Sequence, residues 1–314
     1  MKHEATVTKL LITIFILSQL LGLFLLALDA QVFVSQKGIS VDYSDTAIGE
    51  RPDFQGLGSL LYLTIGVAVG TAVLLFLIKL KVGKNLWKVW YTLAVVIAIM
   101  LSLGVVFSQT IAFLLAVVLA YLKLKRPNML THNLTELLMY AGLAILLVPL
   151  FDVFWAGILL VLISIYDAIA VWKSKHMVDL ATFTTESNLF AGLMVNYKTT
   201  KGKTKLFFKH EPAKKKGVAL PKPKMEGKRQ AILGGGDIVF PLIFSGTVLI
   251  WLLELGYSKF ASFGLSLIIT LGATGALAYL FVKAEKDKFY PAMPFLSTGC
   301  FLGFIVLLTL LLAT

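Results

Sequence analysis

Apolar runs that are long enough to cross a membrane recur along most of this 314-residue chain. A helix needs about 20 mostly apolar residues to span the hydrocarbon core of a bilayer. The composition agrees, because 58% of the residues are hydrophobic and only 15% are charged, whereas soluble domains have about 45–50% apolar and about 25% charged residues. The sequence therefore predicts an integral membrane protein and excludes a water-soluble globular one.

The apolar runs divide into nine predicted membrane spans. Three single spans are predicted at residues 10–28, 57–78 and 294–313. Three longer runs have both ends on the same side of the membrane, so each must hold an even number of crossings, and we expect two helices in each. These runs cover 89–122, 134–172 and 232–282, with turns near 102–110, 149–152 and 254–259. The expected fold class is an all-α polytopic membrane protein with nine transmembrane helices.

The basic residues predict how this bundle is oriented. If the N-terminus is cytoplasmic, 26 of the 29 lysines and arginines fall in cytoplasmic segments and three fall outside. Without the long segment 173–229 the ratio is still 12 to 3, so the positive-inside rule places the C-terminus outside. The membrane would be the cell membrane in a prokaryote. The net charge of +12 thus reflects topology, and we expect no nucleic-acid partner.

The first apolar run has an alternative interpretation as a cleaved secretory signal peptide. Lys2 and Lys9 would form its basic region. However, the run exceeds the usual length of a signal-peptide core, and no clean small-x-small cleavage site follows at Leu28-Asp29-Ala30.

Three regions follow from this division of the chain. A six-span part at 1–172 and a three-span part at 231–314 enclose a basic cytoplasmic loop at 173–230. Within the loop, β-branched and aromatic residues on both sides of Lys201-Gly202 predict a β-hairpin from 193–200 and 203–208. The second half of the loop, rich in lysine and proline, is typical of a flexible linker.

Two acidic residues, Asp167 and Asp237, lie inside apolar runs. An ionisable group in a membrane span is costly and is by default a functional candidate. Asp167 is six residues from Lys173 and Asp237 is eight from Arg229, which corresponds to about 9 and 12 Å from the cytoplasmic side. The two acids are therefore expected at similar depth on consecutive antiparallel spans, where they can face each other.

Two carboxyl groups at close range share one proton, because both cannot ionise comfortably in a low-dielectric site. The ionised group can take a proton from water while the neutral group donates one to a carbonyl oxygen, as in aspartic proteases. This chemistry needs no metal and no other cofactor. Two alternatives remain open: a structural hydrogen bond between the acids and their neighbours, and an ion or proton relay in a transporter or cation channel.

Two further motifs lie on the same side of the membrane. Gly234, Gly235 and Gly236 directly precede Asp237, and glycines allow a close approach of backbone and free backbone groups for a ligand. The segment Pro291-Ala292-Met293-Pro294 opens the last span, where a proline suits a helix start because its missing N–H would be unpaired anyway.

Together these residues resemble the YD, GxGD and PAL motifs of the presenilin and signal peptide peptidase family of intramembrane aspartyl proteases. The matching residues are Tyr166-Asp167, Gly234-Gly235-Gly236-Asp237 and Pro291-Ala292-Met293. Met293 replaces the family's leucine, and the following Pro294 is more similar to presenilins. The resemblance covers nearly the whole chain and implies a presenilin-like fold, with the aspartates on the sixth and seventh spans. It also implies that Gly234 and Gly236 matter more than the variable middle position, Gly235.

The resemblance implies an endopeptidase that hydrolyses peptide bonds within transmembrane segments of single-span membrane proteins or leftover signal peptides. Its partners would be these substrates and the lipid bilayer, and both a monomer and a homo-oligomer are compatible with the sequence. The segment 229–233, with Ile232 and Leu233, is expected to pair with an unwound substrate as an added strand. The alternative is that 229–233 simply continues the seventh helix.

Other intramembrane proteases do not fit the sequence. A rhomboid-like Ser–His pair needs a histidine inside the membrane, and His3, His132, His176 and His210 all lie outside the predicted spans. A zinc protease needs His-Glu-x-x-His, and Val7 occupies the position of the second histidine after His3-Glu4.

Overall fold

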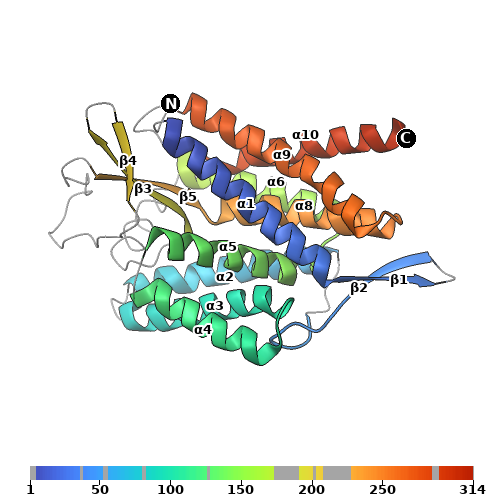
Figure 1. The fold of residues 1–314 in the computed structure, drawn as a ribbon, viewed down its shortest axis with the longest axis horizontal. Coiled ribbons are helices and arrows are strands. Elements are labelled where there is room, and N and C mark those ends of the chain that lie inside the picture. The colour runs from blue at the N-terminus through green and yellow to red at the C-terminus, as the bar shows by residue number, and fades with distance from the viewer. Residues whose placement is uncertain are drawn as a thin grey trace.

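Long helices form most of the computed structural model, which describes residues 5–35, 38–51, 56–79, 83–125, 128–172, 191–200, 203–207, 228–284 and 290–313. Within these ranges, nine helices contain 17 to 25 residues each (Figure 1). They are α1 (Ala5–Asp29), α2 (Leu57–Lys79), α3 (Gly83–Gly104), α4 (Gln109–Lys125), α5 (Met129–Leu147), α6 (Val153–Trp172), α8 (Gly236–Glu254), α9 (Lys259–Lys283) and α10 (Met293–Ala313).

The helix boundaries follow local chemistry close to the predicted turns. A 3-10 turn at Val148–Leu150 contains Pro149, and the Asp152 carboxylate then accepts a hydrogen bond from the Trp155 N–H at 2.8 Å at the start of α6. Ser258 caps α9 by accepting from the Ala261 N–H at 3.2 Å. Such caps satisfy N–H groups that have no partner within the helix.

Six of these helices, namely α1, α5, α6, α8, α9 and α10, are long and apolar enough to cross a membrane. The protein is thus an integral, multi-pass membrane protein. Apolar stretches at Leu57–Val73 and Lys88–Gly104 cover parts of α2 and α3, and α4 has 17 residues, about 26 Å of helix. The total of nine spans stays a prediction.

A three-stranded sheet lies beside the helices, with the strand order β4-β3-β5. β3 (Gly192–Thr200) and β4 (Lys203–Phe207) pair antiparallel around residues 201–202, at the position of the predicted hairpin. The predicted linker between residues 208 and 227 lies outside the described residues. β5 (Lys228–Gly234) pairs antiparallel with β3, so the alternative that 229–233 continues the seventh helix is wrong. Helix begins only at Gly236 because the strand pairing and the unfavourable helix propensity of glycine both oppose an earlier start.

A second, two-stranded hairpin occupies the polar segment after α1 and was not predicted. β1 (Ala30–Ser35) and β2 (Gly38–Tyr43) pair antiparallel, and Figure 1 shows them at the opposite end of the molecule from β3, β4 and β5. Arg51 anchors this end, because its guanidinium contacts the Asp29 carboxylate at 2.6 Å and lies 5.0 Å from the centre of the Tyr43 ring.

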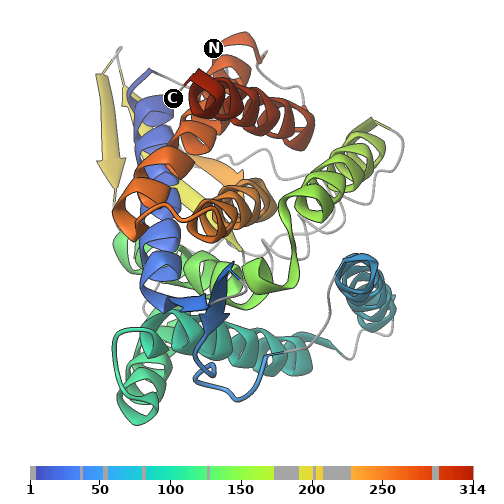
Figure 2. The same ribbon diagram turned by 90° about the vertical axis from the view of Figure 1, so that its right-hand side faces the viewer.

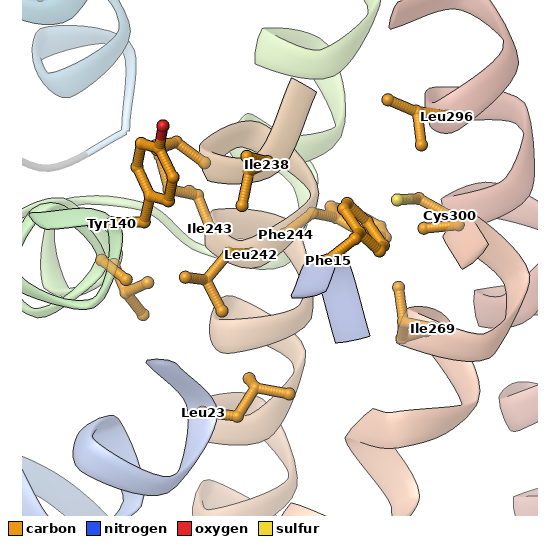
Figure 3. Close-up of a cluster of buried hydrophobic side chains, with 14 of the residues drawn as sticks. Phe15, Leu23, Tyr140, Ile238, Leu242, Ile243, Phe244, Ile269, Leu296 and Cys300 are labelled. Atoms are coloured by element: carbon orange, nitrogen blue, oxygen red, sulfur yellow. The ribbon is translucent and has the colours of Figure 1, made fainter. Parts of the chain in front are cut away.

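The hydrophobic core is centred on α8. This helix contacts α1, α5, α6, α9 and α10, and its side chains Ile238, Leu242 and Phe244 are fully or almost fully buried. Figure 3 shows these side chains directed between residues of the surrounding helices, among them Phe15 of α1 and Cys300 of α10. α1 therefore contributes side chains to the packed core.

Candidate functional site

Asp237 lies in the first turn of α8, immediately after the strand β5 and the glycines. An acidic side chain in this position interacts favourably with the positive end of the helix dipole. The Gly234 backbone N–H lies within hydrogen-bonding reach of the Asp237 carboxyl group. A Cβ atom at Gly234 would lie 3.2 Å from Asp237 Oδ2, so a glycine allows the chain to turn back closely around this acid.

Asp167 lies near the C-terminal end of α6 and is held by the start of α10. The Met293 N–H donates a hydrogen bond to Asp167 Oδ2 at 3.0 Å, and the Ala292 N–H lies within reach of the same carboxyl group. Pro291 and Pro294 have no N–H to donate. The two prolines therefore enclose the two donors that face Asp167, and the carboxylate caps an N–H that the helix leaves unpaired.

The structure brings the two aspartates together. α6 and α8 pack against each other, and the carboxyl groups are close enough for the charge of Asp167 to act on Asp237. Both side chains remain partly exposed. Asp167 is thus held by backbone N–H groups of the Pro291–Pro294 segment and Asp237 by the N–H of Gly234 in its own motif, and a water molecule can reach the pair. This arrangement suits general acid–base chemistry.

The remaining predicted site residues surround the pair unequally. Pro291 and Met293 are buried, Ala292 and Pro294 are partly buried, and Leu233 points into the core. Ile232 is 42% exposed, and Tyr166 is 59% exposed on the outer face of α6. Tyr166 is thus next to Asp167 in the sequence, but its ring is not buried in the site.

The glycine triplet differs from the expectation that its middle position is free to vary. A Cβ at Gly235 would lie 3.0 Å from the Tyr140 hydroxyl and 3.1 Å from the ring, whereas a Cβ at Gly236 would make an ordinary contact of 3.5 Å with Phe240. Gly235 also has a helical backbone with φ of −63°, so close approach and not backbone conformation requires a glycine there. In the structure Gly235 is the more confined of the two.

Sequence reasoning missed a buried polar cluster on α5. Glu136 is fully buried, yet it lies inside the predicted apolar run 134–172 just as Asp167 does, and that signal identifies it as a third intramembrane acid. Its carboxylate accepts hydrogen bonds from Lys123, from the Tyr140 hydroxyl and, at 3.0 Å, from the Gly192 N–H. Lys123 is buried as its ion-pair partner.

The same face of α5 binds the outer edge of β3. His132 Nε2 lies 2.9 Å from the Gly192 carbonyl oxygen. Asn133 donates to the Met194 carbonyl at 2.8 Å and accepts from the Met194 N–H at 2.9 Å. The expectation that all four histidines lie outside the spans is wrong for His132, because the Asn128 side chain caps α5 and the helix starts at Met129, before the predicted apolar run.

Within the described residues, no group of three His, Cys, Asp or Glu side chains is placed to hold a metal ion. A comparison with protein-family models matches residues 12–313 to the family described as signal-peptide peptidase, presenilin aspartyl protease. The chain therefore belongs to this family of intramembrane aspartyl proteases and is a hydrolase that acts on membrane proteins in a bilayer.

Solved structures give the same fold. Two crystal structures of a presenilin family intramembrane aspartate protease, in space groups C222 and P2, match with a TM-score of 0.57 and 18% sequence identity. The first covers 95% of this chain and 99% of its own chain, and the second covers 96% of each. A search of the curated proteins found no match.

Proposed function

We propose that Asp167 and Asp237 are the catalytic pair and that the protein hydrolyses peptide bonds within the transmembrane segments of single-span membrane proteins or signal peptides. The observation that carries this proposal is that the two acids lie close enough to interact electrostatically, with Asp167 held by backbone N–H groups at the start of α10 and Asp237 by the N–H of Gly234. The ionised carboxylate takes a proton from a water molecule, whose oxygen attacks the scissile carbonyl carbon, while the protonated carboxyl group donates its proton to the carbonyl oxygen. The tetrahedral intermediate then loses the amine, which takes a proton from the pair.

Removing either acid tests this assignment. Asp167→Ala and Asp237→Ala should each abolish cleavage of a single-span reporter by the purified protein in detergent, because one carboxyl group cannot be both base and acid. The matched control is Asp42→Ala, which removes an exposed acid of β2 at the opposite end of the molecule. Substantial cleavage by either variant would exclude the pair. An ion flux that is lost in both variants would favour an ion or proton relay through these acids, and a flux that survives the loss of both would point to neither function.

The activity should depend on pH with a bell shape. The working pair holds one proton, so cleavage is lost at low pH when both acids are protonated and at high pH when both are ionised. Initial rates of reporter cleavage between pH 4 and 9 measure this profile. A flat profile across that range would contradict a shared proton.

The direction of the backbone groups in β5 supports strand addition as the mode of substrate binding. Backbone N–H and C=O groups of alternate residues in an antiparallel ladder point to opposite edges. Gly192 and Met194 direct theirs at α5, so Leu193 between them faces β5, where its partner is Leu233. Ile232, one residue away, therefore directs its N–H and C=O to the open edge of β5.

This open edge can re-pair a substrate that has been unwound for cleavage. Peptide groups freed in hydrocarbon each cost several kcal/mol unless they find a partner, and an edge strand offers a row of unpaired groups. β5 is an edge strand and ends three residues before Asp237. A substrate strand added along β5 would therefore lead its scissile bond to the aspartates.

Two proline substitutions test the roles of the two edges of β5 separately. Ile232→Pro removes an N–H from the open edge, so we expect lost cleavage of a membrane reporter with unchanged thermal stability. It should keep its binding of a peptide isostere whose hydroxyl engages both aspartates. Ala231→Pro removes a donor to β3 and should lower stability as well as both activities. Persistent cleavage by Ile232→Pro would contradict strand addition, and simultaneous loss of stability would indicate misfolding instead.

We infer a cytoplasmic N-terminus and an extracytoplasmic C-terminus from the basic residues. In support, Figure 1 shows the start of α1 at the end that carries β3, β4 and β5, and the end of α10 toward the other end. A cysteine introduced at exposed Asp45 should react with a membrane-impermeant thiol reagent added outside intact cells, because Cys300 is buried. Labelling only after lysis would reverse the orientation.

A further inference from the structure

We propose that Glu136 is a positioning residue for the catalytic pair: it sets the place of Asp237 through the β3–β5 strands and through Tyr140. This inference rests on the proposed function, since it concerns the same site. Glu136 does not touch the reacting atoms. It acts on the segment that delivers Asp237, and the structure shows two separate routes from Glu136 to that segment.

The first route runs through the sheet. Glu136 Oε2 accepts the Gly192 N–H at 3.0 Å, and Gly192 is the residue that pairs with Gly234 in β5. Gly234 in turn directs its N–H toward the Asp237 carboxyl group. The buried acid on α5 is thus connected to the catalytic acid on α8 by one strand pair.

The second route runs through the tyrosine one helical turn along α5. The Tyr140 hydroxyl donates to Glu136 Oε2, which holds the ring against Gly235, where a Cβ would lie only 3.0 Å from the hydroxyl oxygen. Gly235 caps α8. A shift of Tyr140 would therefore move the residue at which the helix of Asp237 begins.

The side chains of this cluster fix the register of β3 relative to α5. β3 has backbone groups on its outer edge at Gly192 and Met194, and both are bound by side chains of α5. A slip of β3 by one residue would turn these groups away from α5. It would leave the buried Glu136 carboxylate without the Gly192 N–H, and a buried charge that loses a partner is strongly disfavoured. The buried carboxylate thus excludes alternative registers of β3 that an apolar contact would tolerate.

Three variants separate positioning from bulk stability. Tyr140→Phe removes one hydroxyl, and Glu136→Gln removes the buried charge. Glu136→Gln combined with Lys123→Met removes both charges of the ion pair. The control is Thr247→Val, which deletes a buried hydroxyl ten residues after Asp237 on the same helix, about 15 Å away. Each variant is tested as the full chain in detergent for thermal unfolding, for kcat and KM on the membrane reporter, and for binding of the peptide isostere.

A positioning role predicts a fall in kcat that stability does not explain. Tyr140→Phe should lower kcat about tenfold with KM within about twofold and an unfolding temperature close to that of Thr247→Val, because small displacements of a catalytic group cost rate. Glu136→Gln should lower both kcat and stability. The double variant should regain stability, because no buried charge is left unpaired, and should keep the low kcat.

Two results would overturn the proposal. One is a kcat for Tyr140→Phe equal to that of Thr247→Val. The other is a double variant that recovers kcat together with stability, since a purely structural cluster behaves that way. The proposed function has its own test in parallel, because Asp237→Ala must be inactive under the same conditions. If Asp237→Ala cleaves the reporter, the catalytic assignment fails; if it is inactive while Tyr140→Phe is fully active, only the positioning role fails.

Discussion

The two helices that carry the aspartates are held in very different ways. In the apolar window of α8, 78% of the residues are buried, compared with 17% in α6. α8 has neighbours on all sides, whereas α6 packs mainly against α10 and α8 and touches α2 at only a few residues. In Figure 2, α6 and α2 stand at the margin of the bundle. Asp237 thus lies on a helix that is surrounded by protein, and Asp167 lies on a helix with few protein contacts.

If burial alone fixed the two acids, Asp167 would be held less firmly than Asp237. Ile165 and Ile169, on either side of it, are about half exposed, so that face of α6 is available to lipid or to a substrate helix. The position of Asp167 depends instead on specific polar contacts: the hydrogen bond from the Met293 N–H and the contact between Ser164 and Ser297 on α10. Packing secures Asp237, and hydrogen bonds to α10 secure Asp167.

The largest expected difference between the two helices is in stability. Leu242 of α8 is fully buried and Leu162 of α6 is 42% exposed. Leu242→Ala should lower the free energy of unfolding by about 2–5 kcal/mol, because it leaves a cavity in the packed core. Leu162→Ala should cost less than about 1 kcal/mol, since lipid or detergent fills the space. Denaturation in mixed micelles measures both, and equal losses would refute the contrast.

Gly235 and Gly236, at the start of α8, extend the comparison to catalytic activity. Gly235→Ala brings a methyl group within 3.0 Å of the Tyr140 hydroxyl, whereas Gly236→Ala has room at 3.5 Å from Phe240. We expect Gly235→Ala to lower kcat about tenfold or more, as displacement of a catalytic group does, and Gly236→Ala to stay within about threefold of the unmodified protein. Reporter cleavage distinguishes them. The opposite order would show that the family's motif pattern predicts better than the local contacts.

Membrane character, the helix-rich fold and the two candidate acids could be predicted from the sequence, because apolar run length and intramembrane charge are local signals. The pairing of residues 229–233 with β3 could not be predicted. Residues 229–233 contain no glycine or proline and could continue a helix, and only the bonds between β3 and β5 make them a strand. That pairing joins residues 30 to 42 positions apart, and periodicity carries no information about it.

The difference between α6 and α8 was also invisible in the sequence. Both helices are apolar on all sides, so hydropathy cannot tell a helix surrounded by protein from one that faces lipid. Glu136 lies two residues after the start of the predicted apolar run 134–172, so the argument that found Asp167 applies to it as well. Its burial depends on Lys123, which approaches from a different helix.

The smallest expected effect tests whether hydrogen bonds secure α6. The Ser164 and Ser297 hydroxyls lie 2.7 Å apart between α6 and α10, and both also lie near the Leu160 carbonyl. Ser297→Ala should cost about 0.6–1.7 kcal/mol, the range of interhelical hydrogen bonds in membranes. Because α6 has few other contacts, this loss should appear as a two- to fivefold fall in kcat with little change in unfolding temperature. Thr298→Ala is the control, since the Thr298 hydroxyl is exposed and bonds within its own helix to the Pro294 carbonyl. If Ser297→Ala and Thr298→Ala have equal kcat, the hydroxyl contact does not hold α6, and the position of Asp167 depends on the backbone N–H groups of Ala292 and Met293.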